Sequence, residues 1–176
     1  MKEASGHGIR LELFSADTLD RFLPDLLRTE QVFPEDLRET PESICEAMAR
    51  PRAFGLALFD GGDFAGNGIA FGLDEATWRD LHIDRFRDFD PSVAYLFNIA
   101  VLPDFQGRGF GKLLLMEIRE RTQELGFTVL AGHFRDNASM GNFLAIGGRD
   151  LGEVADWFGT GETYHYGELA LVAPTT

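Results

Sequence analysis

A glycine-rich stretch between an apolar run and a helical pattern carries the clearest chemistry in this sequence. Within VLPDFQGRGFGKLLLMEI, residues 101–118, three positions are glycine: Gly107, Gly109 and Gly111. Glycines let the backbone turn tightly, and the N–H groups of a first helical turn have no intrahelical partner. With a helix dipole behind them and Arg108 and Lys112 beside them, these groups suit a diphosphate bound without a metal. A plain strand-to-helix turn, the structural alternative, needs one glycine rather than three.

Two familiar phosphate-binding patterns do not fit this loop. A P-loop needs glycine where Gln106 stands and a hydroxyl residue where Leu113 stands, because that hydroxyl ligates magnesium. The dinucleotide fingerprint needs two residues between its last glycines, but only one separates Gly109 from Gly111. The loop therefore predicts a site for a diphosphate that is neither a magnesium nucleotide nor a dinucleotide.

Few other residues have types and spacing that suggest catalysis. The four histidines show no pair at metal-ligand spacing, so we predict no metal site; they are His7, His82, His133 and His165. The single cysteine, Cys45, cannot form an internal disulfide, and it lies in the helical pattern PESICEAMAR. We expect a packed helix thiol there, because no base partner for a nucleophile can be placed.

Hydrophobic periodicity, turn residues and caps indicate an alternation of strands and helices around the loop. The run before the loop is apolar almost throughout, as a strand covered on both faces should be, and the loop helix ends at Gly126. Strand, loop helix and next strand form a right-handed parallel crossover. The predicted elements are strand 8–15, helix 15–33, helix 41–48, a hairpin over 53–73 with its turn at 60–63, a helical or irregular excursion over 74–92, strand 92–103, the loop helix, strand 127–134, helix 137–148, and strands 150–158 and 162–172.

Composition limits the class of protein and its partners. At 176 residues and 44% hydrophobic content, we expect one globular domain over residues 1–176. No apolar run approaches the roughly 18 residues of a membrane span, and the first ten residues lack a signal-peptide core, so we expect a cytoplasmic protein that binds no membrane. The net charge of −13 argues against a nucleic-acid partner. Residues 1–92 carry 19 of the 29 acidic residues, which serves either solubility or the steering of a cationic substrate.

The stretch VLPDFQGRGFGKLLL resembles the coenzyme A loop of the GNAT N-acetyltransferases, and the order of elements resembles that fold across nearly the whole chain. The residues in register are Val101, Pro103, Gln106, Gly107, Arg108, Gly109, Gly111 and Leu114. The resemblance implies an α/β (α+β) GNAT fold with a mixed central sheet of about seven strands and about four flanking helices. It also implies a splay between strands four and five, in which acetyl-CoA binds.

The same resemblance implies which residues bind the cofactor. The pantetheine arm is expected along Ile99, Ala100 and Val101, and a second, partial motif in NASMGNFLAIGGR implies contacts from Asn137 and Phe143. The diphosphate is expected on residues 106–112, namely Gln106, Gly107, Arg108, Gly109, Phe110, Gly111 and Lys112. The tyrosine that protonates the leaving thiolate in many relatives is missing, because Leu144 stands in its place.

The catalytic residues are less well specified by this pattern. Some relatives place a glutamate base eleven residues before the loop glutamine, where this chain has Tyr95, which can act through water or only shape the pocket. Asn98 is the one polar side chain in its strand, and Glu30 precedes a VFP turn that lies beside the acceptor pocket in some relatives; a solvated helix face is the alternative for Glu30. Tyr164 or His165, on the last strand, and His133 are further candidates for proton transfer or acceptor binding.

The resemblance implies transfer of an acetyl group from acetyl-CoA to a primary amine, by direct attack in a ternary complex. The acidic first half favours a cationic acceptor, either a small amine or a peptide amine. One alternative is a non-catalytic acyl-CoA-binding module, and another is a nucleotide-binding domain without specificity for coenzyme A. The sequence leaves a monomer and a homodimer both open.

Overall fold

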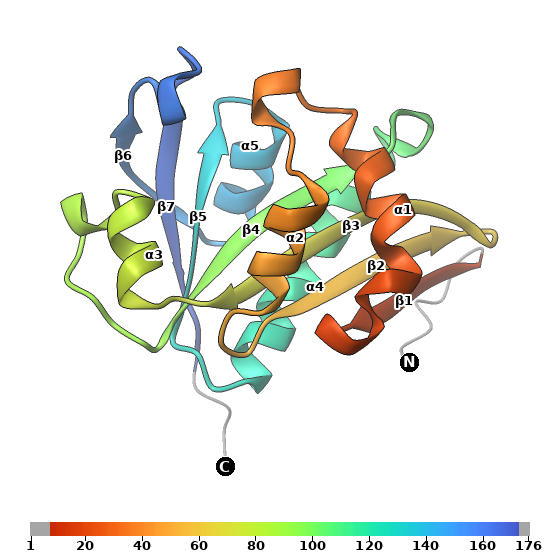
Figure 1. The fold of residues 1–176 in the computed structure, drawn as a ribbon, viewed down its shortest axis with the longest axis horizontal. Helices are drawn as coiled ribbons and strands as arrows, with labels where there is room; N and C mark the ends of the chain where they lie inside the picture. Colours follow the sequence, from red (N-terminus) through yellow and green to blue (C-terminus); the bar gives the residue numbers. More distant parts are fainter. Residues whose placement is uncertain (1–7, 173–176) are drawn as a thin grey trace.

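The computed structural model describes residues 8–172, and its centre is a sheet of seven strands in the order β1-β2-β3-β4-β5-β7-β6 (Figure 1). Only β4 and β5 are paired in parallel, and every other neighbouring pair in the described residues is antiparallel. The sheet is therefore mixed, as predicted. The strands are β1 Ile9–Phe14, β2 Phe54–Asp60, β3 Asp63–Gly72, β4 Val93–Val101, β5 Val129–Arg135, β6 Arg149–Val154 and β7 Tyr164–Ala170.

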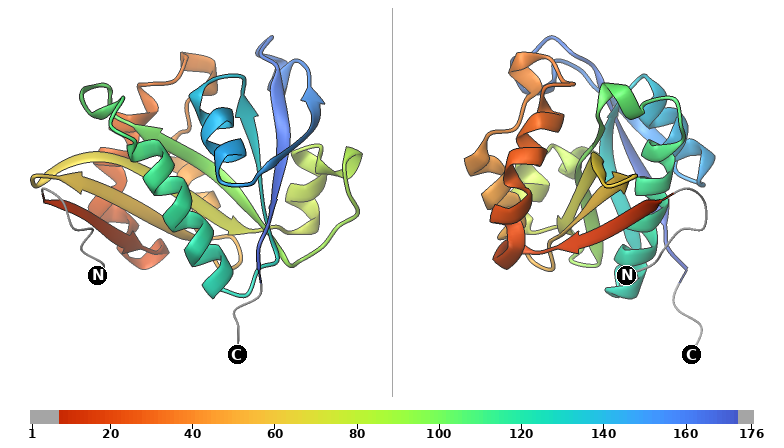
Figure 2. Two further views of the ribbon diagram at one scale, coloured as in Figure 1. Left: turned by 180° about the vertical axis from the view of Figure 1, so that it is seen from behind. Right: turned by 90° about the vertical axis from the view of Figure 1, so that its right-hand side faces the viewer.

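Helices cover both faces of this sheet. Figure 2 shows α4 and α5 on the face opposite to α1 and α2. The described residues contain five α-helices rather than the four expected, because the excursion after β3 contributes the short α3. The helices are α1 Leu19–Glu30, α2 Pro41–Met48, α3 Glu75–Asp80, α4 Phe110–Glu124 and α5 Ala138–Ala145. Among residues 8–172, none of these helices has the length and apolar character needed to span a membrane.

Local sequence signals explain where several elements begin and end. In α2, Thr40 and Ser43 form a reciprocal capping box, and Pro41 occupies the first helical position, where its missing N–H costs nothing. Two glycines with positive φ, Gly61 and Gly62, close the β2–β3 hairpin, and Gly126 with φ 84° follows the end of α4. These boundaries agree with the sequence predictions.

Two local predictions are wrong. Cys45 is exposed, because Ile44, Ala47 and Met48 occupy the buried face of α2. The strand expected over 150–158 ends at Val154, since the chain then turns through Asp156 with φ 51°, a left-handed conformation that a strand cannot contain.

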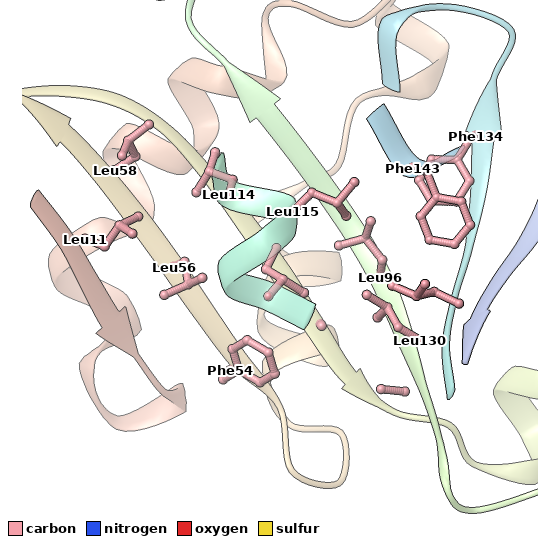
Figure 3. Packing of buried hydrophobic residues seen from close by; sticks show 14 of the residues in the cluster. Leu11, Phe54, Leu56, Leu58, Leu96, Leu114, Leu115, Leu130, Phe134 and Phe143 are labelled. Carbon is pink, nitrogen blue, oxygen red and sulfur yellow. The ribbon is translucent and has the colours of Figure 1, made fainter. Parts of the chain in front are cut away.

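The core on the α4 face fixes the loop helix against the sheet. Leu114, Leu115 and Ile118 of α4 are at most 2% exposed and pack on strand residues such as Leu96 and Leu130 (Figure 3). Burial of a leucine or isoleucine side chain contributes about 1.5–3 kcal/mol. The start of α4 is therefore held at a defined place above β4.

Strands β4 and β5 are paired over only half of their length. Four pairs, from Val93–Val129 to Leu96–Gly132, join them, although β4 continues to Val101 and β5 to Arg135. The register between β3 and β4 shifts at the next residue, Phe97, which marks a β-bulge. Because a bulge bends its strand and β5 stays paired with β7 to its end, the two strands separate here. The predicted splay between strands four and five is confirmed.

Candidate functional site

The free edge of β4 borders a cavity of about 630 Å³, which we call the glycine-loop cavity. Its walls come from the end of β4, the loop before α4, the start of α4 and the segment between β5 and α5. It is lined by Val32, Phe33, Ile99, Ala100, Val101, Phe105, Gln106, Gly107, Gly109, Phe110, Gly111, Lys112, Leu115, Phe134, Arg135, Asn137, Ala138, Ser139 and Asn142. None of these residues is acidic, whereas Lys112 and Arg135 are basic, so the cavity suits an anion.

The three loop glycines have different structural reasons. Gly107 and Gly109 have φ of 77° and 80°, which only glycine adopts without strain, so the turn itself requires them. Gly111 lies in the first turn of α4 with an ordinary φ, and a Cβ added there would meet only Asn142 Nδ2, at 3.4 Å. Neither backbone conformation nor packing explains this glycine. Open space for a ligand above the first helical turn does explain it.

The first turn of α4 supplies hydrogen-bond donors to this cavity. The first N–H to bond within the helix is that of Leu113, to Gly109 O at 3.0 Å. The N–H groups of the three residues before it, Phe110, Gly111 and Lys112, have no intrahelical partner, as at any helix start. These N–H groups and the helix dipole favour a negatively charged group at this point.

Most of the residues predicted to bind cofactor line the glycine-loop cavity, but two do not. Arg108 donates to Asp60 Oδ2 at 3.0 Å and to Asp104 O at 3.2 Å, so a hairpin carboxylate neutralises the charge expected for the diphosphate. Phe143 is 0% exposed and stacks on Phe134 with ring centroids 4.3 Å apart, so it supports the cavity wall without touching a ligand. Leu144, beside it, is 47% exposed and lines neither the glycine-loop cavity nor the second cavity described next.

A second cavity of about 670 Å³, which we call the acidic cavity, adjoins the first along the splay. The two share Phe33, Ile99, Phe134, Arg135, Asn137 and Ser139. Four carboxylates line the acidic cavity: Glu30, Asp36, Glu39 and Glu46. All four residues nominated for catalysis also line it, and so does His133; the nominated set is Glu30, Tyr95, Asn98 and Tyr164.

Glu30 is buried at 2% exposure, which contradicts the alternative of a solvated helix face. Its Oε1 accepts from Asn98 Nδ2 at 2.9 Å, and its Oε2 accepts from the Glu39 N–H at 2.9 Å. Behind it, Asn67 donates to Asn98 at 3.4 Å and accepts from Thr29 Oγ1 at 2.5 Å. Burial raises the pKa of Glu30. Because both of its oxygens are bonded, Glu30 ties the α1–α2 segment to β4.

Sequence reasoning missed Glu39, which lies immediately before the N-cap of α2. It is half-buried, its Oε2 accepts from Ser43 Oγ at 2.6 Å, and its other carboxylate oxygen accepts no hydrogen bond from the described residues. Burial raises the pKa of Glu39 above its ordinary value. No sequence signal distinguished this glutamate from its acidic neighbours Glu35, Asp36 and Glu42.

Tyr95 and His133 form a buried pair on adjacent strands. The Tyr95 hydroxyl lies 2.8 Å from His133 Nδ1, and burial raises the pKa of Tyr95, so the phenol keeps its proton. Burial lowers the pKa of His133 to about 3, so its imidazole is neutral. Tyr95 and His133 both line the acidic cavity as neutral groups.

An aromatic segment after β6 forms another part of the wall of the acidic cavity. Trp157 stacks between His133, at 4.3 Å, and Tyr164, at 4.9 Å, and Phe158 packs edge-on against it. The Tyr164 hydroxyl forms no hydrogen bond within residues 8–172, and burial raises the pKa of this phenol. Sequence reasoning missed Trp157 and Phe158 because they lie in the segment expected to be strand.

No group of three or more histidine, cysteine, aspartate or glutamate side chains within residues 8–172 could hold a metal ion. The two cavities instead differ in charge: the glycine-loop cavity is lined by basic and neutral residues, whereas the acidic cavity has four carboxylates against two arginines, Arg38 and Arg135. They meet where β4 leaves β5. The arrangement can hold an anionic ligand and a cationic one with their ends in contact.

Comparison with known proteins identifies matches to both sequence and fold. Residues 19–147 match the model of the acetyltransferase (GNAT) family. A curated relative from Haemophilus influenzae, [ribosomal protein bS18]-alanine N-acetyltransferase, is 48% identical over 46 residues, which are 26% of this chain and 32% of that protein. The match thus spans about a third of the relative's length.

Two solved structures match the fold over almost the whole chain. The ribosomal-protein-S18-alanine N-acetyltransferase from Escherichia coli superposes with a TM-score of 0.69 at 19% identity, covering 94% of this chain and 97% of that one. A Bacillus subtilis acetyltransferase in complex with CoA gives a TM-score of 0.67 at 18% identity, covering 93% and 99%. At these identities the likeness concerns the fold.

Proposed function

The chain belongs to the GNAT acetyltransferase family, and we propose that it transfers an acetyl group from acetyl-CoA to a primary amine by direct attack in a ternary complex. The single observation that carries this proposal is the pair of adjoining cavities of opposite charge at the splay of β4 and β5. The glycine-loop cavity suits an anionic donor and the acidic cavity suits a cationic acceptor. The acetyl group then passes directly from one ligand to the other.

The residues of the glycine-loop cavity fit coenzyme A. The unpaired edge of Ile99–Val101 offers backbone groups to the amides of the pantetheine arm, as a neighbouring strand would. The first turn of α4, with Lys112, offers N–H donors and positive charge to the diphosphate. When bound, acetyl-CoA supplies an activated acyl group as a thioester. The related Bacillus subtilis structure contains CoA, which supports the same choice here.

The residues of the acidic cavity bind and orient the acceptor. Four carboxylates attract a cationic amine, and the aromatic wall of Trp157 and Phe158 offers apolar contacts to its carbon chain and cation–π contacts to its ammonium group. Both a small cationic amine and a peptide amine fit this chemistry. The name of the curated relative, which acts on an alanine of a ribosomal protein, is consistent with the second.

A proton must reach the sulfur that leaves, and we infer that Tyr164, which lines the acidic cavity, gives it. Its hydroxyl is free within residues 8–172, its raised pKa keeps it protonated, and its pairing partner Arg135 lines both cavities. Leu144, at the position where relatives carry tyrosine, has no proton to donate. We therefore assign to Tyr164 the role of proton donor.

The test has two steps. Calorimetry with acetyl-CoA, CoA and ATP measures donor binding; we expect tight binding of the first two and weak binding of ATP. Release of free thiol is then followed with a panel of alkylamines, diamines and short peptides, and turnover of at least one class is expected. Absence of coenzyme A binding contradicts the proposal. Tight binding with no turnover on any acceptor, together with a co-purifying protein, favours the non-catalytic acyl-CoA-binding module instead.

A further inference from the structure

The amine that attacks must first lose a proton, and the acidic cavity offers several groups that could take it. The ionisable side chains that line it are Glu30, Asp36, Arg38, Glu39, Glu46, Tyr95, His133, Arg135 and Tyr164. A proton acceptor needs an unbonded lone pair that faces the cavity, and an affinity for protons closer to that of the amine than an ordinary carboxylate has.

Most of the candidates fail one requirement. Both arginines are permanently charged, and the two tyrosines keep their protons. His133 binds protons weakly and has Nδ1 engaged with Tyr95, while its Nε2 is buried without a partner. Glu30 is only 2% exposed and is held by hydrogen bonds from Asn98 and from the Glu39 N–H, so an amine in the cavity does not reach its remaining lone pairs. Asp36 and Glu46 are exposed, so water screens their charges.

Glu39 meets both requirements. It is half-buried, so it is partly desolvated and still reachable, and one carboxylate oxygen accepts no hydrogen bond from the described residues. The other oxygen is held by Ser43 Oγ at 2.6 Å, and its own backbone N–H is held by Glu30 at 2.9 Å. The carboxylate is thus fixed from two sides.

We propose that Glu39 is the general base of the acetyl transfer, and that Glu30 and Ser43 position it. This inference rests on the proposed function. The acceptor enters as an ammonium ion and gives one proton to Glu39. The freed lone pair then forms the C–N bond while the electron pair of the C–S bond leaves on sulfur. Tyr164 gives its proton to sulfur, and the second proton lost from nitrogen restores the Tyr164 phenol. Glu39 releases the first proton to solvent, so the products are the amide, the free thiol and one proton.

The structure supports the assignment from a second direction. Glu39, Tyr95 and Tyr164 all line the acidic cavity, and the Glu39 carboxylate further raises the pKa of both phenols. The proposed base and the proposed proton donor thus border the same space, as transfer from nitrogen to sulfur requires.

The test compares Glu39→Gln with Glu42→Gln, a matched control on the exposed first turn of α2 that lines neither cavity. Glutamine keeps the acceptor oxygen for Ser43, so Glu39→Gln is expected to fold. With an alkylamine acceptor, we expect Glu39→Gln to lose about 10²–10⁴-fold in kcat with coenzyme A affinity unchanged. The acid limb of the wild-type pH profile of kcat should disappear, whereas Glu42→Gln should match the wild type.

An acceptor with a low amine pKa, such as a hydrazide, separates proton removal from simple attraction. A hydrazide is neutral at the assay pH and needs no base before attack. The loss of kcat in Glu39→Gln should therefore be much smaller with a hydrazide than with an alkylamine. The inference is overturned if Glu39→Gln keeps the wild-type pH profile, or if only KM rises while kcat is unchanged, which assigns Glu39 to binding alone. Both results are compatible with the proposed acetyl transfer. A wild-type protein that neither binds coenzyme A nor acetylates any amine contradicts both the proposed function and the role of Glu39.

Discussion

Substitution of Gly111 by alanine should affect stability and cofactor binding in opposite directions. Gly111 has an ordinary helical φ, and the nearest atom to an added Cβ is Asn142 Nδ2 at 3.4 Å, which is normal contact. Replacing glycine by alanine inside a helix stabilises a protein by about 0.5–1 kcal/mol. For a chain of 176 residues this corresponds to a rise in Tm of roughly 1–4 °C.

Coenzyme A binding should weaken in the same variant, because the new methyl group occupies the space above the first turn of α4. Loss of one hydrogen bond to a charged diphosphate costs about 1.5–3 kcal/mol. That cost corresponds to a roughly tenfold to hundredfold rise in Kd. Differential scanning calorimetry measures the first effect, and isothermal titration with CoA measures the second.

The control is Gly141→Ala in α5, another helical glycine with no atom within 4 Å of its added Cβ, which lines neither cavity. It should raise Tm by a similar amount and leave coenzyme A affinity unchanged. If Gly111→Ala binds coenzyme A as tightly as the control does, the diphosphate does not approach this turn. The location of the donor site would then be wrong, even if the protein is an acetyltransferase.

Three further predictions concern other residues. Tyr164→Phe should lower kcat about 10-fold or more without changing coenzyme A affinity, measured by thiol release and calorimetry; an unchanged kcat removes Tyr164 as proton donor. Exposed Cys45 should react with a thiol reagent in the folded protein, and Cys45→Ser should keep full activity and Tm, which a packed thiol would not permit. The raised pKa of Glu30 means that its stabilising contribution is present below about pH 4.5 and is lost as pH rises through its folded pKa. In urea unfolding across pH 4–8, the free energy of unfolding of Glu30→Gln should therefore rise relative to that of the wild type as pH rises. A difference in this free energy that stays constant with pH contradicts the reasoning.

The lining of the glycine-loop cavity was largely predictable from sequence because its parts are adjacent in the chain. The end of β4, the glycine turn and the first turn of α4 follow one another, and their spacing alone excluded two other phosphate-binding patterns. The errors in this half concern side-chain direction. Nothing in QGRGFG indicates that Arg108 turns back to Asp60, forty-eight residues earlier, because that contact depends on where the β2–β3 hairpin ends.

The acceptor half was not predictable to the same degree, because its walls come from distant segments. Glu39 precedes α2, and Trp157 follows β6, more than a hundred residues later in the chain. They face one cavity only because β7 pairs with β5 and β5 separates from β4 after Leu96. The bulge at Phe97 that begins this separation leaves no periodic signal, since an apolar run reads the same with or without an extra residue.

The two cavities differ in how freely the residues that line them can vary. The glycine-loop cavity, the proposed donor site, lies on a strand edge and a helix start that are fixed by the buried core of α4, so its geometry tolerates little variation. The acidic cavity, the proposed acceptor site, is lined in large part by the segment before α2 and the turn after β6, which are connections whose sequence can vary without disturbing that core. Substitutions of Trp157 or Phe158 should therefore change which amine is used while coenzyme A affinity stays constant. Glu39 is held in place by Glu30, which is itself anchored to β4 through Asn98, and so stays fixed relative to the donor site while the opposite wall varies.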